Sequence, residues 1–153
     1  MFEYHGWVNV LESAEADDED VRVEEARLRV IAEGVQRRIA EIASPYLLDL
    51  RWMNGAVFVH FGGQANHRDP EVLDFFREVG RRAPGSYGLL HVRDDEAPGR
   101  GNEVRVLRMV RGEVSEHTEP LLSPCVPVLE DPWTAAESGG RGPDRVERHV
   151  RGL

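Results

Sequence analysis

The sequence predicts an α+β domain whose elements follow the order β-α-β-β-α-β-β. Three observations carry this prediction. Two segments repeat apolar residues at steps of three and four, several shorter runs alternate apolar and polar residues, and the pair Asn54-Gly55 separates two of these runs. The order is close to the split β-α-β arrangement, and it predicts an antiparallel or mixed sheet with two helices packed on one face.

The first part of the chain is predicted to form a strand and a long helix. The run Phe2–Leu11 is rich in residues that favour strands, and acidic residues collect after it, as is typical of a helix N-terminus. Apolar residues at helical spacing from Leu28 to Ile42 then form one buried stripe. Gly34 interrupts this helix at a cost of about 1 kcal/mol relative to alanine. Ser44-Pro45 ends it, because the residue before a proline disfavours the α conformation.

A hairpin and a second helix follow. The runs Tyr46–Met53 and Ala56–Phe61 form the two strands of the hairpin, and Gly62-Gly63 is expected to end the second strand. Asp69-Pro70 supplies an N-cap and a first helical residue for the second helix. The buried stripe of that helix consists of Val72, Phe75, Phe76 and Val79.

The last predicted strands are Ser86–Arg93, Asn102–Arg111 and a short run near Val114. Alternation places Tyr87, Leu89 and His91 on one face of the first of these strands. After Glu119, repeated prolines prevent a continuous helix or ladder. We therefore expect a single domain over residues 1–131 and a flexible, disordered tail over residues 132–153.

The composition excludes several classes of function. The chain has 153 residues and a net charge of −9, and all 19 basic residues are arginine. The acidic balance argues against a nucleic-acid partner, which requires a basic face. The absence of lysine excludes Schiff-base and P-loop chemistry. The sequence contains no apolar run long enough for a membrane span and does not begin like a secretory signal, so we expect a cytoplasmic protein without a membrane partner.

The residues that could carry catalysis or bind a metal form weak patterns. The histidines are spread over separate elements and Cys125 is the only cysteine, so the spacing predicts neither a metal site nor a cofactor. Cys125 fits a small buried hydrophobe better than a nucleophile, which needs a nearby base. The aromatic residues Trp7, Trp52 and Tyr87 lie in predicted strands and are expected mainly in the core. His60 is instead expected on an outer face of the sheet.

Two acidic segments are the remaining candidates for a binding site. They consist of Asp17, Asp18, Glu19 and Asp20 before the first helix, and of Asp94, Asp95 and Glu96 after the strand Ser86–Arg93. The simplest interpretation is a solvated helix start and a loop whose aspartates fix a turn. The functional interpretation is a negative docking surface for a basic protein, since complementary charge speeds association. An alternative is a small enzyme or ligand-binding domain that uses the Asp94–Glu96 loop and a histidine.

Four short segments form an ordered set along residues 2–131. They are Glu3-Tyr4-His5-Gly6-Trp7, Gly85-Ser86-Tyr87-Gly88-Leu89-Leu90 leading to Asp94-Asp95-Glu96, Asn102 with Arg111-Gly112, and Leu122-Ser123-Pro124-Cys125-Val126-Pro127 leading to Glu130-Asp131. This set resembles the immunity protein 7 family, bacterial immunity proteins of polymorphic toxin systems. The resemblance implies an α+β domain that neutralises a cognate toxin domain by stoichiometric binding, without catalysis. An acidic inhibitor suits a basic toxin such as a nuclease.

Overall fold

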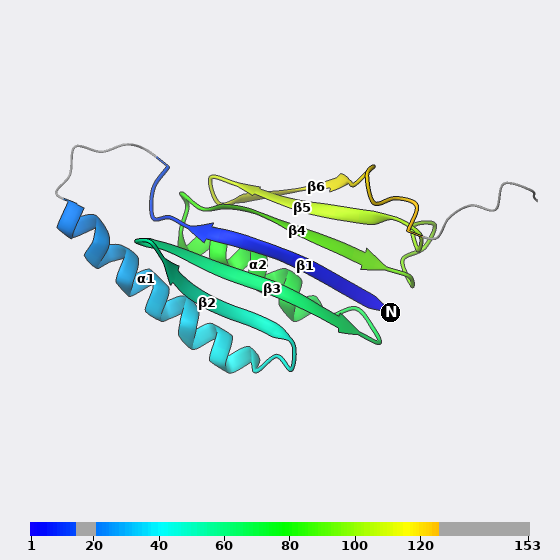
Figure 1. The fold of residues 1–153 in the computed structure, drawn as a ribbon, viewed down its shortest axis with the longest axis horizontal. Coiled ribbons are helices and arrows are strands. Elements are labelled where there is room, and N and C mark those ends of the chain that lie inside the picture. The colour runs from blue at the N-terminus through cyan, green and yellow to red at the C-terminus, as the bar shows by residue number, and fades with distance from the viewer. Residues whose placement is uncertain (15–20, 126–153) are drawn as a thin grey trace, which may run out of the picture.

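The computed structural model describes residues 1–14 and 21–125, which contain six strands and two helices (Figure 1). The acidic residues Asp17–Asp20 and the predicted tail 132–153 lie outside the described residues. The elements are β1 (Phe2–Val10), α1 (Val21–Ile42), β2 (Leu47–Met53), β3 (Ala56–Ala65), α2 (Pro70–Arg82), β4 (Tyr87–Asp94), β5 (Val104–Val110) and β6 (Glu113–Thr118).

The strands form an antiparallel sheet in the order β2-β3-β1-β4-β5-β6. The N-terminal strand β1 lies inside the sheet and pairs with both β3 and β4 along its length. At one end Phe2 lies opposite Ala65 and Asp94, and eight residues later Val10 lies opposite Val57. The predicted α+β class and element order are therefore confirmed, and the sheet is antiparallel rather than mixed.

Both helices pack on the same face of the sheet, as predicted (Figure 1). Strand residues that point toward the helices are buried and form a continuous apolar core with them. Phe61 of β3 contacts Phe75 and Phe76 of α2, with ring centroids 5.8 and 5.6 Å apart. The stripe of α1 adds Val35 and Ile39 to this core. Full burial of each such side chain contributes about 1.5–3 kcal/mol.

Local sequence signals determine where several elements begin and end. Asn54 and Gly55 have φ angles of 50° and 82°, so both central residues of the β2–β3 turn are left-handed, as a type I′ hairpin requires. The Asp69 carboxylate accepts the backbone N–H groups of Glu71 and Val72 at 3.0 and 3.4 Å and caps α2. These two predictions are confirmed in detail.

The strand β3 is longer than predicted. Gly62 and Gly63 were expected to end it at Phe61, but the pairing with β1 continues to Ala65. Gly63 lies opposite Tyr4, and a Cβ on this glycine would lie 2.5 Å from the Tyr4 hydroxyl oxygen. The glycine therefore makes room for a cross-strand ring and does not break the strand.

Gly80 holds α2 close to the turn between β5 and β6. A Cβ at Gly80 would lie 2.2 Å from the carbonyl oxygen of Gly112, which itself has a φ of 72°. The obstructing atom belongs to the backbone of a left-handed residue and has little freedom to move away. The absence of a side chain at Gly80 is thus a condition for the packing of α2 on the sheet.

We predict that Gly80→Ala lowers the free energy of unfolding by about 2 kcal/mol, because the clash outweighs the gain in helix propensity. Gly34→Ala is the matched control inside α1. The nearest obstruction there is a guanidinium nitrogen of Arg82 at 3.2 Å, the end of a flexible side chain. The control should keep the wild-type stability or raise it by up to about 1 kcal/mol. Urea denaturation measures both variants, and equal effects would contradict the proposed packing constraint.

Candidate functional site

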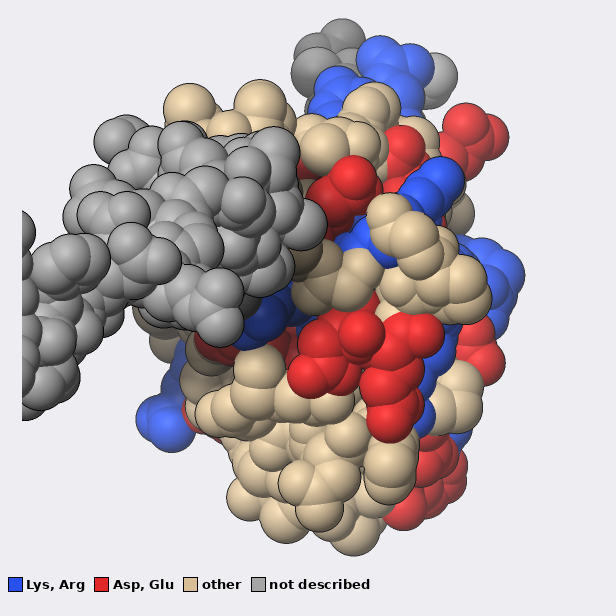
Figure 2. Space-filling view, turned by 90° about the vertical axis from the view of Figure 1, so that its right-hand side faces the viewer, with Lys and Arg blue, Asp and Glu red and all other residues tan. Residues whose placement is uncertain are grey.

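The Asp94–Glu96 loop lies at the end of the sheet where the chain begins. Asp94 is paired with Phe2, and the backbone N–H of Asp95 donates to the carbonyl oxygen of Met1 at 3.1 Å. Figure 2 looks onto this end of the molecule and shows acidic side chains near its centre with basic side chains beside them. The predicted acidic loop is thus at the surface, in a region of mixed charge.

Asp94 has a structural role in this loop. Its side chain is only 12% exposed, and one carboxylate oxygen lies 3.7 Å from a guanidinium nitrogen of Arg68. The other oxygen accepts the backbone N–H of Glu96 at 3.1 Å. These contacts fix the turn after β4, as the aspartates in the sequence predict. Asp94 therefore contributes little free negative charge to the surface.

Asp95 and Glu96 are the exposed carboxylates of the loop. Asp95 pairs with the amino group of Met1, and Glu96 lies 3.0 Å from Nδ1 of His67. The structure thus places a histidine next to the loop, as the enzyme alternative requires. However, the side chains of His67 and Glu96 are 80% and 53% exposed. Charged groups act most strongly on a reaction where water is excluded, so this open pair is poorly suited to catalysis.

The described residues that flank the first acidic segment in the sequence lie at the opposite end of the sheet. The backbone N–H of Gly85 donates to the carbonyl oxygen of Leu11 at 3.0 Å, and α1 begins far from the N-terminus (Figure 1). The nine residues of β1 separate these flanking residues from the Asp94–Glu96 loop by about 27 Å. Surface charges are largely screened beyond roughly 8–10 Å in physiological salt. We therefore treat the two acidic segments as separate contacts.

Within residues 1–14 and 21–125, neither α1 nor α2 covers the second side of the sheet, which we call the open face. Successive side chains of a strand point to opposite sides, so the residues that alternate with the buried core lie on this face. On the four inner strands it includes Glu3, His5, Trp7 and Asn9 of β1, Phe58, His60 and Gln64 of β3, Tyr87, Leu89, His91 and Arg93 of β4, and Val104, Val106, Arg108 and Val110 of β5. The expected position of His60 agrees with this arrangement.

An aromatic cluster occupies one end of the open face. The Trp7 ring lies 6.3 Å from Phe58 and 5.8 Å from Tyr87, the latter edge to face. Tyr87 is 43% exposed, and its hydroxyl oxygen accepts an N–H from the side chain of Asn9 at 3.0 Å. The prediction that Trp7 and Tyr87 belong to the core is wrong, because both point away from the helices.

Trp52 also differs from its prediction. It is 41% exposed because it lies near the end of β2, an edge strand of the sheet. On its helix-facing side the guanidinium of Arg29 lies 5.2 Å from the ring centroid, a cation–π contact with α1. Burial of a strand aromatic thus depends on which strands lie beside it, which sequence alternation does not reveal.

The chain beyond β6 runs alongside the start of β5. Glu119 donates its backbone N–H to the carbonyl oxygen of Val104 at 2.9 Å, and the Ser123 hydroxyl accepts the N–H of Val104 at 2.9 Å. Cys125 donates its backbone N–H to Asn102 at 3.0 Å. We call residues 119–125 the strap. Cys125 is only partly buried, so the prediction of a buried hydrophobe at this position is wrong.

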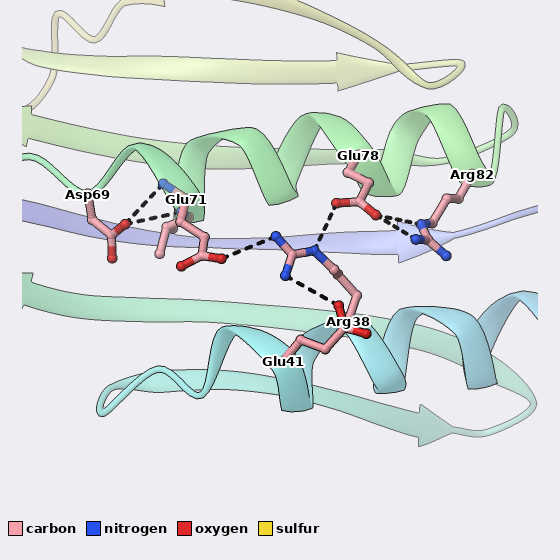
Figure 3. Close-up of polar contacts among 7 residues, drawn as sticks. Arg38, Glu41, Asp69, Glu71, Glu78 and Arg82 are labelled. Carbon is pink, nitrogen blue, oxygen red and sulfur yellow. Dashed lines mark hydrogen bonds and ion pairs between the residues drawn. The ribbon is translucent and has the colours of Figure 1, made fainter.

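A network of ion pairs links the two helices (Figure 3). Arg38 of α1 lies 3.2 Å from Glu71 and 3.3 Å from Glu78 of α2, and 3.5 Å from Glu41 in its own helix. The Nε of Arg82 donates to Glu78 at 2.7 Å. This network lies on the helical side of the molecule, away from the open face, and its role is to hold α1 against α2.

The network shifts the pKa values of its members. The hydrogen bond to Glu71 is the largest cause that raises the pKa of Arg38. Burial is the largest single influence on Glu78 and would raise its pKa, but the hydrogen bonds and charges of Arg82 and Arg38 together outweigh it. They hold the pKa of Glu78 below its usual value. The ionised form of Glu78 is therefore the form that stabilises the helix pair.

Two kinds of site are absent from residues 1–14 and 21–125. These residues contain no group of three or more histidine, cysteine, aspartate or glutamate side chains that could hold a metal ion. None of the helices in the same part of the chain is both long enough and apolar enough to span a membrane.

Exposed aromatic residues are typical of surfaces that bind other proteins. The fold and its open face therefore fit a protein-binding domain.

Residues 1–131 match the family described as Immunity protein 7, and the chain belongs to this family. This membership confirms the resemblance found in the sequence and implies an immunity protein of a toxin system. Comparison with curated proteins and with solved structures found no match.

We predict that Glu78→Gln lowers the free energy of unfolding at neutral pH by about 1 kcal/mol, because Arg38 and Arg82 lose their shared carboxylate. Folding lowers the pKa of Glu78, so its contribution is present above the ordinary value of 4.5 and is lost as the pH falls through the lower folded-state pKa. The difference between wild type and variant should therefore shrink as the pH falls below the ordinary value of 4.5 and through the lower folded-state pKa. Chemical denaturation over a pH series measures this difference.

Glu41→Gln is the matched control for this measurement. Glu41 also pairs with Arg38, but it lies in the same helix and its side chain is largely exposed. Its removal should change the free energy of unfolding by less than about 0.5 kcal/mol. Equal losses for the two variants, or a loss at Glu78 that persists in acid, would contradict the proposed role of the network.

Proposed function

We propose that this protein binds a cognate bacterial toxin domain and neutralises it as a stoichiometric complex. The family match over residues 1–131 is the observation that carries the proposal. Inhibition by binding needs only a rigid, preformed surface, and the antiparallel sheet with its open face provides one. The protein performs no chemical step of its own in this account. We expect it to act in the cytoplasm of the cell that makes the toxin.

A basic toxin domain, such as a nuclease, is the partner that the charge of the chain favours. The net charge of −9 attracts a basic protein over distances longer than any contact and raises the rate of association. A nuclease must carry a positive surface for the phosphates of its substrate. Carboxylates of the inhibitor can occupy that surface and exclude the nucleic acid.

The acidic contacts proposed for the toxin are the two segments singled out in the sequence. In the loop, Asp95 and Glu96 are exposed and available for a partner, whereas Asp94 holds the turn in shape. The second proposed contact consists of Asp17, Asp18, Glu19 and Asp20. It is tested separately, because the described residues that flank it in the sequence lie at the other end of the sheet.

Co-expression with the toxin domain encoded beside this gene tests the proposal. We expect the protein to rescue cell growth and to co-purify with the toxin domain in a 1:1 ratio. A measured complex without rescue would remove neutralisation but keep binding. The proposal fails if the toxin kills the cells in the presence of the protein and no complex forms.

We further predict that the double variant Asp95→Asn, Glu96→Gln slows association with the toxin domain severalfold at low salt, because rim charges act mainly on the association rate. The effect should diminish at high salt, where these charges are screened. Stopped-flow or surface plasmon resonance at two salt concentrations measures the rate. The pair Asp17→Asn, Asp18→Asn tests the first segment in the same way.

The double variant Glu33→Gln, Asp74→Asn is the matched control. It removes the same two negative charges from exposed positions on α1 and α2. Association should slow less in this control than in the loop variant. Equal slowing would mean that net charge alone steers the partner, and the local contact at the Asp94–Glu96 loop would be rejected.

A further inference from the structure

The aromatic cluster of Trp7, Phe58 and Tyr87 is part of a larger apolar patch at one end of the open face. Trp7 is directly paired with Leu89 of β4, and Tyr87 lies two residues before Leu89 on the same side of the sheet. The register of β4 and β5 places Val110 beside Tyr87. Tyr87 and Val110 are 43% and 38% exposed. Exposed apolar patches of this kind mark sites of interaction.

Arg108 of β5 lies in the same part of the open face. It is directly paired with Leu89, and its neighbours on the same side of β5 are Val106 and Val110. Tyr87 lies diagonally across from Arg108, at a spacing of about 7–8 Å that aromatic and long side chains can bridge. Arg108 therefore stands among apolar residues and next to the aromatic cluster.

The guanidinium of Arg108 has no anionic partner in the part of the chain that the structure describes. The side chain is exposed and makes neither an ion pair nor a hydrogen bond there. Its direct partner on β6 is Ser115, and the diagonal neighbour Glu113 forms no ion pair with it. Arg51 of β2, in contrast, pairs with Asp49. The donors of Arg108 are therefore available to an anion that a partner supplies.

The combination of residue types on this surface favours a protein partner. Tryptophan, tyrosine and arginine are the residues most enriched at the energetic centres of protein interfaces, and Trp7, Tyr87 and Arg108 share one surface here. Arginine can bind a carboxylate through two parallel hydrogen bonds, and this contact gains strength where water is excluded. The net charge of −9 disfavours a nucleic acid, the other common source of an anion.

The positive charge of Arg108 is compatible with a toxin domain that is basic overall. Long-range attraction depends on net charge, whereas the strength of a docked complex depends on the groups that meet. A basic domain also carries carboxylates, and one of them can face Arg108. Tyr87 and Asp94 mark the two ends of β4, about 24 Å apart. The apolar patch and the acidic Asp94–Glu96 loop can therefore contact different parts of the toxin surface.

The open face as a whole provides enough area for such a complex. It spans six strands of about seven residues, or roughly 24 by 24 Å and about 600 Å². At the end away from the aromatic cluster, a pocket of about 270 Å³ lies between the strap and the strands, and its lining includes His5, His91 and Leu122. A standard interface uses about 800 Å² on each partner, so the face and the Asp94–Glu96 loop together approach that size.

We propose that the toxin domain docks on the open face through Trp7, Tyr87 and Arg108, with an apolar side chain packed on the two rings and a carboxylate bound by the guanidinium. This inference rests on the proposed function, because it names the part of the surface that holds the toxin. The Asp94–Glu96 loop then acts mainly on the approach of the toxin domain, whereas the contacts at Trp7, Tyr87 and Arg108 hold the docked complex.

Reversal of the charge at Arg108 separates a local contact from attraction by net charge. Arg108→Glu makes the chain more negative by two charges, which by itself would speed the approach of a basic toxin domain. If Arg108 binds a carboxylate, the same variant should weaken the affinity at least about tenfold, because repulsion replaces the ion pair. Titration calorimetry with the full-length protein and the purified toxin domain measures the affinity.

Arg37→Glu is the matched control. Arg37 is exposed on α1, one of the helices that cover the other side of the sheet, and it also makes no ion pair within the described part of the chain. Its reversal changes the net charge by the same amount and should leave the affinity unchanged or increase it. Urea denaturation checks that both variants are folded.

The wild-type protein separates this inference from the proposed function. If it does not bind the toxin domain, the proposed function fails and the inference fails with it. If it binds and the two reversal variants have equal affinities, the inference alone is overturned. It is also overturned if the wild type binds a single-stranded oligonucleotide in physiological salt and Arg108→Glu removes this binding, because Arg108 then serves a phosphate.

Tyr87→Ala and Trp52→Ala provide a second test that does not rely on a charge reversal. The two side chains are almost equally exposed, but Trp52 lies on the helical side of the sheet. Tyr87→Ala should weaken binding of the toxin domain at least about tenfold, whereas Trp52→Ala should leave the affinity unchanged. Equal affinities of the two variants would overturn the assignment of the docking surface.

Discussion

The pairing of β1 with both β3 and β4 is the constraint on which the rest of the structure depends. The first strand of the chain becomes an inner strand of the sheet, so it joins the hairpin β2–β3 to the meander β4–β5–β6. Close approach of the backbones is part of this pairing, since a Cβ on Gly6 would lie 2.2 Å from the carbonyl oxygen of Leu89. The same pairing places His5 beside His91 and brings Asp94 to the N-terminus. The fold and the candidate interface are therefore consequences of one set of strand contacts.

The two sides of the sheet have different roles because the helices cover only one of them. On the helical side, apolar burial and the network around Arg38 account for stability. The open face carries aromatic rings, of which Tyr87 is 43% exposed, and a buried donor at Arg93 whose missing partner among the described residues costs free energy. Exposed apolar surface of this kind marks a site of interaction with a partner. In the proposed function, the toxin domain binds the open face while the helical side keeps the domain folded.

The elements were predictable where their signals are local. Asn54-Gly55 and Asp69-Pro70 act on their own backbone, and helical spacing identifies the buried side of α2 from neighbouring residues alone. Alternation in β4 shows that its two faces differ, but which face the helices cover depends on pairing with β1, far away in the sequence. The sequence pattern therefore assigns Trp7 and Tyr87 to the core, although they lie on the open face. Asp94 was recognised as a loop carboxylate, yet its contact with Arg68, and the pocket formed by the strap, arise only after distant segments meet.

The central claim is that the toxin binds the open face, and oxidative footprinting of side chains in the free and bound protein tests it most directly. Tyr87 and Trp52 are nearly equal in exposure, at 43% and 41%, but Tyr87 lies on the open face and Trp52 on the helical side. We expect the complex to protect Tyr87, Trp7 and Leu122 from oxidation and to leave Trp52 reactive. Protection of Trp52 with continued oxidation of Tyr87 and Leu122 would place the toxin on the helical side and contradict the account.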